Sequence, residues 1–308
     1  MSRRILVLAH TGRRNAIIAS QQACTRLIDL GLQPVMRPEE LADIQQEYGS
    51  SAASAEVLGD GVDLGDIELV MVLGGDGTIL RAAELVREAD IPLLGVNLGH
   101  VGFLAESERA DLEETVRWVA DRSYTVEERT TIEVLVLLGG TILERSWALN
   151  EAAIEKANRE RMIEVVMEVD GRPVSSFGCD GVVLATPTGS TAYAFSAGGP
   201  VVWPGVEALL MVPISAHALF AKPLVVAPSS VLAVELLSRT HAAGVLWCDG
   251  RRSIDLPPGA RIEVRRSEHP VRLARTRQTP FSERLVRKFE LPIQGWRGPV
   301  KPQGTVAP

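Results

Sequence analysis

A carboxylate among glycines is the strongest candidate for chemistry in this sequence. The apolar run Leu69–Leu73 leads directly into residues 74–78, GGDGT. Such a run is typical of a buried parallel strand, and apolar residues recur at helical spacing after Thr78, so the glycines are expected at a strand-to-helix turn. Glycine lets a ligand approach the backbone, and amides at a helix N-terminus favour anions. Asp76 is therefore a candidate base in an anion-binding turn; the alternative is that it only caps the helix.

Three further stretches carry polar side chains that packing does not explain. Asn150 beside Glu151 suits recognition of hydroxyls and base edges, although a solvated strand end is the alternative. Residues 186–193, TPTGSTAY, would form a polar cradle in which Tyr193 stacks on a base or hydrogen-bonds to it; a solvated loop is the alternative. His217 suits contact with phosphate, but a histidine in an apolar segment is more often structural.

Apolar strands and helices alternate through the first part of the chain. Strands are expected at 5–9, 32–36, 69–73 and 91–97, with helices between them and over 111–120. This pattern predicts an α/β domain with a Rossmann-like parallel sheet over residues 1–128. Ligands bind at the carboxyl ends of such strands, where the GGDGT turn and the loop after residue 97 both lie. Arg13, at the start of the first helix, suits either phosphate contact or a solvated helix end.

From about Arg129 the sequence becomes β-rich. Hairpins are expected at 132–138 with 141–149 and at 162–169 with 172–177, because two short β-rich runs flank Gly-Gly or Asp-Gly in each case. Further strands are expected at 181–185, 209–212, 224–226, 231–237, 245–248 and 260–265. We therefore predict a second, mainly antiparallel β domain over residues 129–266, and a flexible tail over 296–308.

Composition and charge limit the classes of partner and the cellular location to be expected. The chain has 308 residues, 46% of them hydrophobic, and a net charge of −7, which argues against a nucleic-acid or membrane surface as partner. No run of eighteen apolar residues and no secretory segment occurs, so we expect a cytoplasmic protein. The cysteines are scattered and predict neither disulfides nor a zinc site. P-loop, G-x-G-x-x-G, nucleophile-elbow and H-E-x-x-H motifs are missing.

Taken together, these motifs resemble those of the ATP-NAD kinase family. The GGDGT turn, residues 97–104, Asn150-Glu151, Asp180-Gly181, residues 186–193 and Asp249-Gly250 occur in that family's order and approximate spacing, and the resemblance runs from Ile5 to Arg287. The first motif alone is shared with lipid kinases and resembles that of phosphofructokinases, whereas Asn150-Glu151 with residues 186–193 is specific to NAD kinases.

The resemblance implies an activity and partners. The activity is transfer of phosphate from ATP, or from polyphosphate, to the 2′-hydroxyl of the adenosine ribose of NAD, giving NADP. The family implies Mg²⁺ or another divalent metal with ATP, no metal-ligating set of its own, a homodimer or homotetramer, and return of residues 267–295 to the first domain. A lipid kinase and an NAD-binding sensor or dehydrogenase are the alternatives, to be separated by assays for lipid phosphorylation and for NADP formation.

The family also implies residue roles. Asp76 would be the catalytic base, and Lys222 stands where many members have arginine, so a phosphate role there is in doubt. The candidate phosphate-binding residues, among which Arg13 is included for its place at a helix N-terminus, are Gly75, Gly77, Thr78, Arg13 and His217. The candidate NAD-binding residues are His100, Phe103, Asn150, Glu151, Asp180, Thr188, Thr191, Ala192, Tyr193 and Ser196.

Overall fold

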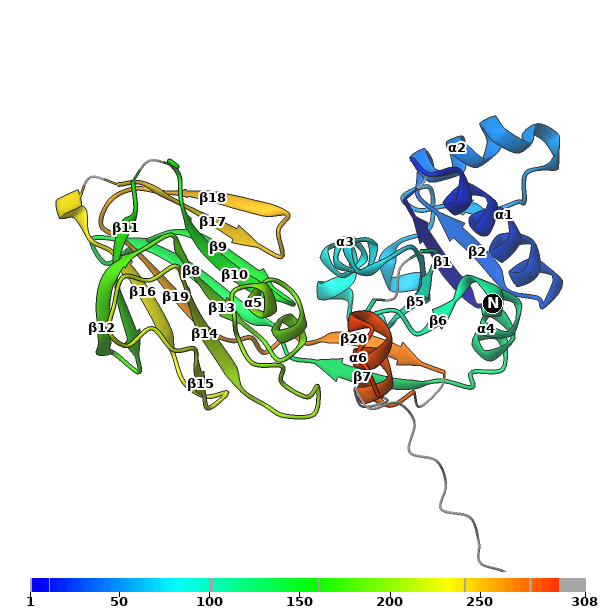
Figure 1. The fold of residues 1–308 in the computed structure, drawn as a ribbon. Helices are drawn as coiled ribbons and strands as arrows, with labels where there is room; N and C mark the ends of the chain where they lie inside the picture. Colours follow the sequence, from blue (N-terminus) through cyan, green and yellow to red (C-terminus); the bar gives the residue numbers. More distant parts are fainter. Residues whose placement is uncertain are drawn as a thin grey trace, which may run out of the picture. The chain divides into compact units, whose positions relative to one another are not determined.

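The chain forms two compact units (Figure 1). The structure, a computed structural model, describes residues 2–10, 12–99, 102–159, 161–240, 242–276 and 279–293. Unit 1 comprises the described residues of Met1–Ile79, Leu93–Thr125 and Ala274–Pro308, and unit 2 those of Leu80–Pro92 and Val126–Leu273. The domain boundaries expected from the sequence, 1–128 with 267–295, and 129–266, remain predictions.

The sheet that carries unit 1 is mostly parallel; of its strands, β7 after Thr125 and β20 before Ala274 are assigned to unit 2. The sheet order is β3-β2-β1-β4-β5-β20-β7, with β6 beside β5, and the pairs from β3 through β6 run parallel. Every residue from Ile5 to Ala9 on β1 is fully buried, as expected for a parallel strand covered on both faces. The strands are β1 (Arg4–Ala9), β2 (Gln33–Met36), β3 (Glu56–Val57), β4 (Ile67–Leu73), β5 (Leu93–Asn97), β6 (Ser107–Glu108), β7 (Thr125–Arg129) and β20 (Val271–Arg275).

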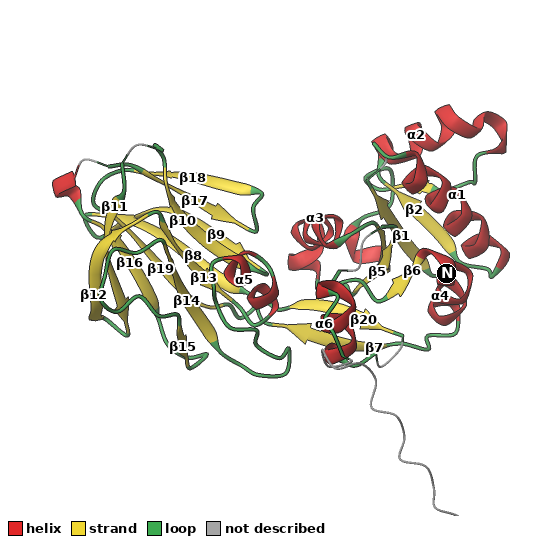
Figure 2. Ribbon diagram, viewed as in Figure 1, coloured by secondary structure: helices red, strands yellow, loops and turns green. Residues whose placement is uncertain are grey.

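Helices α1–α4 lie between strands in the sequence, and α6 follows the last strand, β20 (Figure 2). The helices are α1 (Arg14–Asp29), α2 (Pro38–Tyr48), α3 (Asp76–Val86), α4 (Leu112–Ala120) and α6 (Phe281–Phe289). Short 3-10 turns lie at Gly49–Ser51, Leu64–Asp66, Arg87–Ala89 and Arg109–Asp111. The boundary between the units falls inside α3, after Ile79, so this helix begins in unit 1 and ends in unit 2.

Unit 2 contains two six-stranded antiparallel sheets. Their orders are β15-β14-β13-β10-β17-β18 and β12-β11-β16-β19-β8-β9, and buried residues of both sheets form one core cluster. The strands are β8 (Ile132–Leu138), β9 (Thr141–Ala148), β10 (Glu151–Lys156), β11 (Ile163–Val169), β12 (Arg172–Cys179), β13 (Gly181–Ala185), β14 (Leu209–Ile214), β15 (Leu224–Val226), β16 (Leu232–Leu236), β17 (Gly244–Cys248), β18 (Arg252–Leu256) and β19 (Ala260–Arg266). Between β13 and β14 lie a 3-10 turn, Thr188–Thr191, and the short helix α5 (Tyr193–Ser196); another 3-10 turn spans Ser238–Thr240.

The predicted fold class is confirmed: a mostly parallel sheet forms the first part and antiparallel sheets the second. One placement was wrong. Glu151 was expected at the end of a strand, but β9 ends at Ala148 and Glu151 begins β10, which lies between β13 and β17. The alanines that follow, Ala152 and Ala153, are buried inside the sheet, where small side chains fit. No helix in the described part of the chain is long and apolar enough to cross a membrane.

Candidate functional site

The GGDGT turn joins β4 to α3. Glycine is required at Gly74, because a Cβ there would overlap the side chain of Thr78. The Gly75 carbonyl accepts the amides of Thr78 at 2.9 Å and Ile79 at 3.2 Å, so Gly75 is the residue that opens the helix. Gly77 faces open space. The turn thus exposes backbone at the carboxyl end of a parallel strand, as expected. The helix begins earlier than expected, at Asp76 instead of after Thr78, so Asp76 lies in the first helical turn.

The carboxylate of Asp76 is held by the loop that follows β5. Its Oδ2 accepts the amide of Phe103 at 3.0 Å and its Oδ1 accepts the amide of Leu104 at 3.1 Å. A Cβ on Gly102 would overlap Oδ1, so only glycine lets the loop lie this close. An ionised carboxylate can accept about four hydrogen bonds, so two amides fix its orientation and leave acceptor positions for a ligand hydroxyl.

Aromatic rings surround Phe103. Its ring lies 5.7 Å from that of Phe281 and 5.8 Å from that of Phe289, both on α6, and only 9% of Phe103 is exposed. The loop that holds Asp76 is therefore packed against the last helix of the described chain. His100, the other candidate of this loop, lies outside the described residues.

In unit 2, a pocket of about 310 Å³ lies over one face of β10. Glu151, Ala153 and Glu155 alternate along the strand and share this face, which also lines the pocket with Tyr193, Trp247 and Gly250. Glu155 and Trp247 were not singled out from the sequence. The alternation along 151–155 would have indicated Glu155, once that segment was taken as a strand.

Glu151 is the most perturbed carboxyl group of this pocket. Burial raises its pKa to about 8; the nearby charge of Asp249 adds to the shift, and a hydrogen bond from the Tyr193 amide opposes it. Its Oε2 is buried and has no hydrogen-bond partner among the described residues. A buried carboxyl oxygen without a partner costs free energy, which a hydrogen bond with a ligand hydroxyl would recover whether the carboxyl is ionised or protonated.

Asp249 holds the strand connection that carries Asn150. Its carboxylate accepts the amides of Leu149 at 3.0 Å and Asn150 at 2.7 Å, and pairs with Arg252 at 2.9 Å. The backbone at Asp249 has φ of 54°, in the left-handed region that aspartate tolerates better than most residues. Burial raises the pKa of this carboxyl. The Asp249-Gly250 motif therefore fixes the start of β10.

In the hydroxyl-rich segment, residues 186–193 with Ser196, some side chains are buried in structural hydrogen bonds and others are accessible. Thr186 donates to the Leu149 carbonyl at 2.6 Å and Ser190 to the Pro187 carbonyl at 2.7 Å, and both are fully buried. Gly189 lies against Asn150, and a Cβ there would overlap the Asn150 carbonyl. The partly buried or exposed members are Thr188, Thr191, Ala192, Tyr193 and Ser196.

Tyr193 reaches back to β10. Its hydroxyl donates to Glu155 Oε1 at 2.5 Å, and burial together with this bond raises the pKa of the tyrosine to about 12. Tyr193 therefore stays a neutral donor at physiological pH, with its ring at the rim of the pocket.

Asp180 and His217 lie close together in unit 2. Asp180 pairs with Lys156 at 2.5 Å, and this hydrogen bond is the main cause that lowers the pKa of Asp180, with smaller contributions from Ser215 and the charge of His217. The His217 amide donates to the Gly178 carbonyl at 2.8 Å. Lys222 is exposed before β15.

Arg13 is exposed at the N-cap of α1, in unit 1. The predicted phosphate residues are thus split: Gly75, Gly77, Thr78 and Arg13 lie in unit 1 and His217 in unit 2.

Family models match most of the chain. A model described as the ATP-NAD kinase N-terminal domain matches residues 5–124, and one described as the ATP-NAD kinase C-terminal domain matches residues 149–276. The NAD kinase of Leifsonia xyli subsp. xyli is 62% identical over 297 residues, covering 96% of this chain and 97% of that protein. The NAD kinase of Thermobifida fusca is 59% identical over 302 residues, covering 96% and 92%.

Solved structures share the fold. A crystal structure of yeast NADH kinase complexed with NADH has a TM-score of 0.84 and 23% identity, covering 94% of this chain and 88% of that one. A crystal structure of an NAD kinase from Archaeoglobus fulgidus in complex with ATP has a TM-score of 0.69 and 25% identity, covering 94% and 99%.

Proposed function

The chain belongs to the ATP-NAD kinase family and is a kinase that phosphorylates NAD to NADP, and we propose how its residues divide that work. In this proposal Asp76 takes the proton from the 2′-hydroxyl of the adenosine ribose, and the glycines beside it leave room for phosphate. Phosphoryl transfer needs chiefly in-line positioning of the reacting groups and neutralisation of charge. One oriented carboxylate that accepts the proton of the attacking hydroxyl is therefore enough on the acceptor side.

The observation that supports this role is the hydrogen bonding of Asp76. Each carboxylate oxygen accepts one amide from the loop after β5, at 3.0 and 3.1 Å. A carboxylate that merely capped α3 would instead accept amides of its own first turn. An oriented carboxylate with free acceptor positions, at the carboxyl end of β4, is what removal of a hydroxyl proton requires.

We assign the recognition of NAD mainly to unit 2. Glu151 offers the buried Oε2 without a partner, and Tyr193 and Trp247 offer aromatic surface at the same pocket. The remaining proposed NAD-binding residues are His100, Phe103, Asn150, Asp180, Thr188, Thr191, Ala192 and Ser196. Glu155, which holds the Tyr193 hydroxyl, is added because it orients that ring.

We assign phosphate contacts to the GGDGT turn, with Arg13 and His217. ATP is the donor we propose, with polyphosphate as the alternative to be compared in the same assay. Mg²⁺ would bind together with ATP, coordinated by its phosphates, because this ion keeps several waters and needs few protein ligands. The described residues contain no cluster of three or more histidine, cysteine or acidic side chains suited to a metal. A homodimer or homotetramer in the cytoplasm completes the proposal.

The test is the D76N variant. Asparagine keeps the size of the side chain and one acceptor oxygen but cannot take a proton. We expect kcat to fall about 10²- to 10⁴-fold with little change in the affinity for NAD. NADP formed from NAD, ATP and Mg²⁺ is measured by its enzymatic reduction, and NAD binding by calorimetry. A variant with near-normal kcat would exclude Asp76 as the base.

A further inference from the structure

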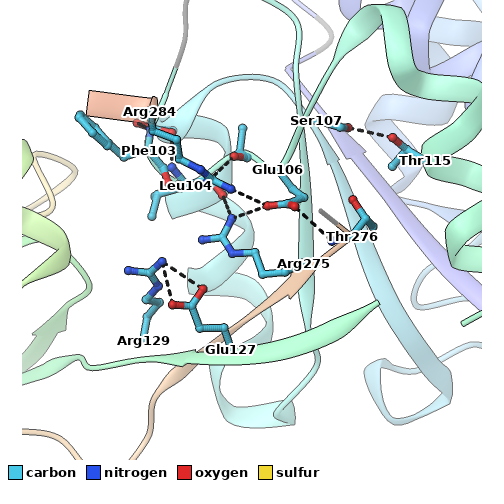
Figure 3. Close-up of polar contacts among 12 residues, drawn as sticks. Phe103, Leu104, Glu106, Ser107, Thr115, Glu127, Arg129, Arg275, Thr276 and Arg284 are labelled. Atoms are coloured by element: carbon cyan, nitrogen blue, oxygen red, sulfur yellow. Dashed lines mark hydrogen bonds and ion pairs between the residues drawn. The ribbon is translucent and has the colours of Figure 1, made fainter. Parts of the chain in front are cut away.

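A buried acidic residue joins two arginines beside the loop that holds Asp76 (Figure 3). The side chain of Glu106 is fully buried, and its Oε2 contacts Arg284 at 2.7 Å and Arg275 at 3.1 Å, while Oε1 accepts the Thr276 amide at 3.2 Å. Arg275 comes from β20 and Arg284 from α6, about 170 residues after Glu106 in the chain (275 − 106 = 169). Segments distant in sequence therefore meet at this residue.

The same arginines bind the backbone of the loop. Arg284 Nη1 donates to the carbonyls of Phe103 at 3.2 Å and Ala105 at 2.9 Å, and Arg275 Nη1 donates to that of Leu104 at 3.1 Å. Phe103 and Leu104 thus give their amides to Asp76 and receive arginine donors on their carbonyls. Figure 3 shows Arg284, Arg275 and Glu106 gathered around these two residues.

We propose that Arg284 is a positioning residue for Asp76. It fixes the peptides of residues 103–105, whose amides in turn fix the carboxylate. The inference rests on the proposed role of Asp76 as base. Arg284 contacts no atom of the GGDGT turn itself among the contacts found in the described part of the chain, so its effect on chemistry passes through the loop.

The geometry favours arginine specifically. A planar guanidinium serves three acceptors in fixed directions, two carbonyls and a carboxylate, whereas lysine offers a single point charge. Glu106 supplies a negative charge beside two arginines whose side chains are largely shielded from water, 10% and 12% exposed. Displacing a catalytic group by about 1 Å can cost about 10²-fold in rate, so a loosened loop is expected to reduce turnover visibly.

The test compares R284M with R287M. Methionine keeps the apolar stem of the side chain and removes its donors. Arg287 lies on the same helix and is exposed, and within the described part of the chain its one ion pair is with Glu108, at 3.5 Å. We expect R284M to lower kcat about 10- to 100-fold while the KM for NAD changes less than about threefold, and R287M to leave both unchanged. R284K should stay close to R284M.

A double-mutant cycle with D76N separates this inference from the proposed function. If Arg284 acts through Asp76, adding R284M to D76N lowers the residual rate, measured with radiolabelled ATP, no further. All rates are measured well below the melting temperature of each variant. Near-normal activity of D76N would overturn the role of Asp76. An inactive D76N with a fully active R284M, or a loss in the double variant equal to the product of the single losses, would overturn the positioning role alone.

Discussion

At the scale of single residues, the buried Glu151 in the pocket of unit 2 makes the stability of the fold depend on pH. Its folded-state pKa is about 8, raised mainly by burial, whereas in the unfolded chain it titrates near its ordinary value of 4.5. The folded protein therefore binds the extra proton between these values, so the stability contribution is full below about pH 4.5 and is lost as pH rises through about 8.

We expect the E151Q variant to remove this pH dependence, because glutamine is neutral throughout. Each pH unit between the two pKa values costs about 1.4 kcal/mol, so the wild type should lose roughly 3 kcal/mol relative to E151Q between pH 5 and 8. Its melting temperature should then fall by roughly 10 °C relative to E151Q, because about 1 kcal/mol corresponds to 2–4 °C in domains of about 150–250 residues. Scanning calorimetry across that range measures it. E144Q, at an exposed position on β9, is the control and should track the wild type. Parallel curves for wild type and E151Q would contradict a raised pKa.

The sequence could indicate a site residue only where its neighbours in the chain also pointed to a function. Asp76 and Glu151 stood out because each sits beside an informative neighbour, a glycine run or an asparagine. Glu155 and Trp247 lie on a pocket only because β10 and β17 pair, and Arg284 reaches Glu106 across 178 residues, the type of contact that no local pattern encodes.

At the scale of elements, the turn before α3 and the loop after β5 approach so closely that one methyl group matters. A Cβ on Gly102 would overlap the Asp76 carboxylate. We expect G102A to displace that carboxylate and to lower kcat at least about tenfold, with a smaller effect on KM, because misplacement of a catalytic group acts on the transition state.

The matched control for that variant is G99A. A Cβ on Gly99, in the same loop, meets nothing within 4 Å. Steady-state kinetics of the two variants, with circular dichroism to confirm folding, separates a local displacement from a general effect of alanine in the loop. Equal activity of G102A and G99A would show that the loop moves aside without moving Asp76.

The sequence predicted correctly whether a segment is a helix or a strand wherever its apolar residues followed one clear pattern. The predicted parallel strands were continuous apolar runs, and four strands of the β domain, β8, β9, β11 and β12, lay in two hairpins with glycine turns. The strands β3, β6, β7, β10, β18 and β20 were not predicted. β3 and β6 have two residues each, β10 carries small alanines, and β7, β18 and β20 mix charged with apolar residues over five positions. Their pairing partners, rather than their own side chains, make them strands.

At the scale of the whole molecule, unit 1 depends on the end of the described chain. Residues from Ala274 onward belong to it, β20 lies between β5 and β7 in its sheet, and α6 supplies Arg284, Phe281 and Phe289. We expect a chain ending at Thr276 to lose turnover at least as strongly as R284M.

Stability should fall in the same truncated chain. Removing two aromatic partners of Phe103 and one arginine of Glu106 exposes apolar surface and leaves a buried carboxylate with fewer donors. Calorimetry should show unit 1 melting earlier while unit 2, which keeps all its own contacts, melts where it did before. A single unchanged transition together with full activity would contradict this dependence.

The order of the strands in unit 1 also sets the order in which the protein can mature on the ribosome. Asp76 leaves the ribosome early, whereas Arg284 follows 208 residues later (284 − 76 = 208). At about 5–20 residues per second, roughly 10–40 s pass between them. Throughout that interval the sheet lacks β20 and the loop beside Asp76 lacks its arginines. On the proposed roles of Asp76 and Arg284, a nascent chain carries the catalytic carboxylate before the residues that position it, and the kinase is expected to become active only after α6 has been synthesised.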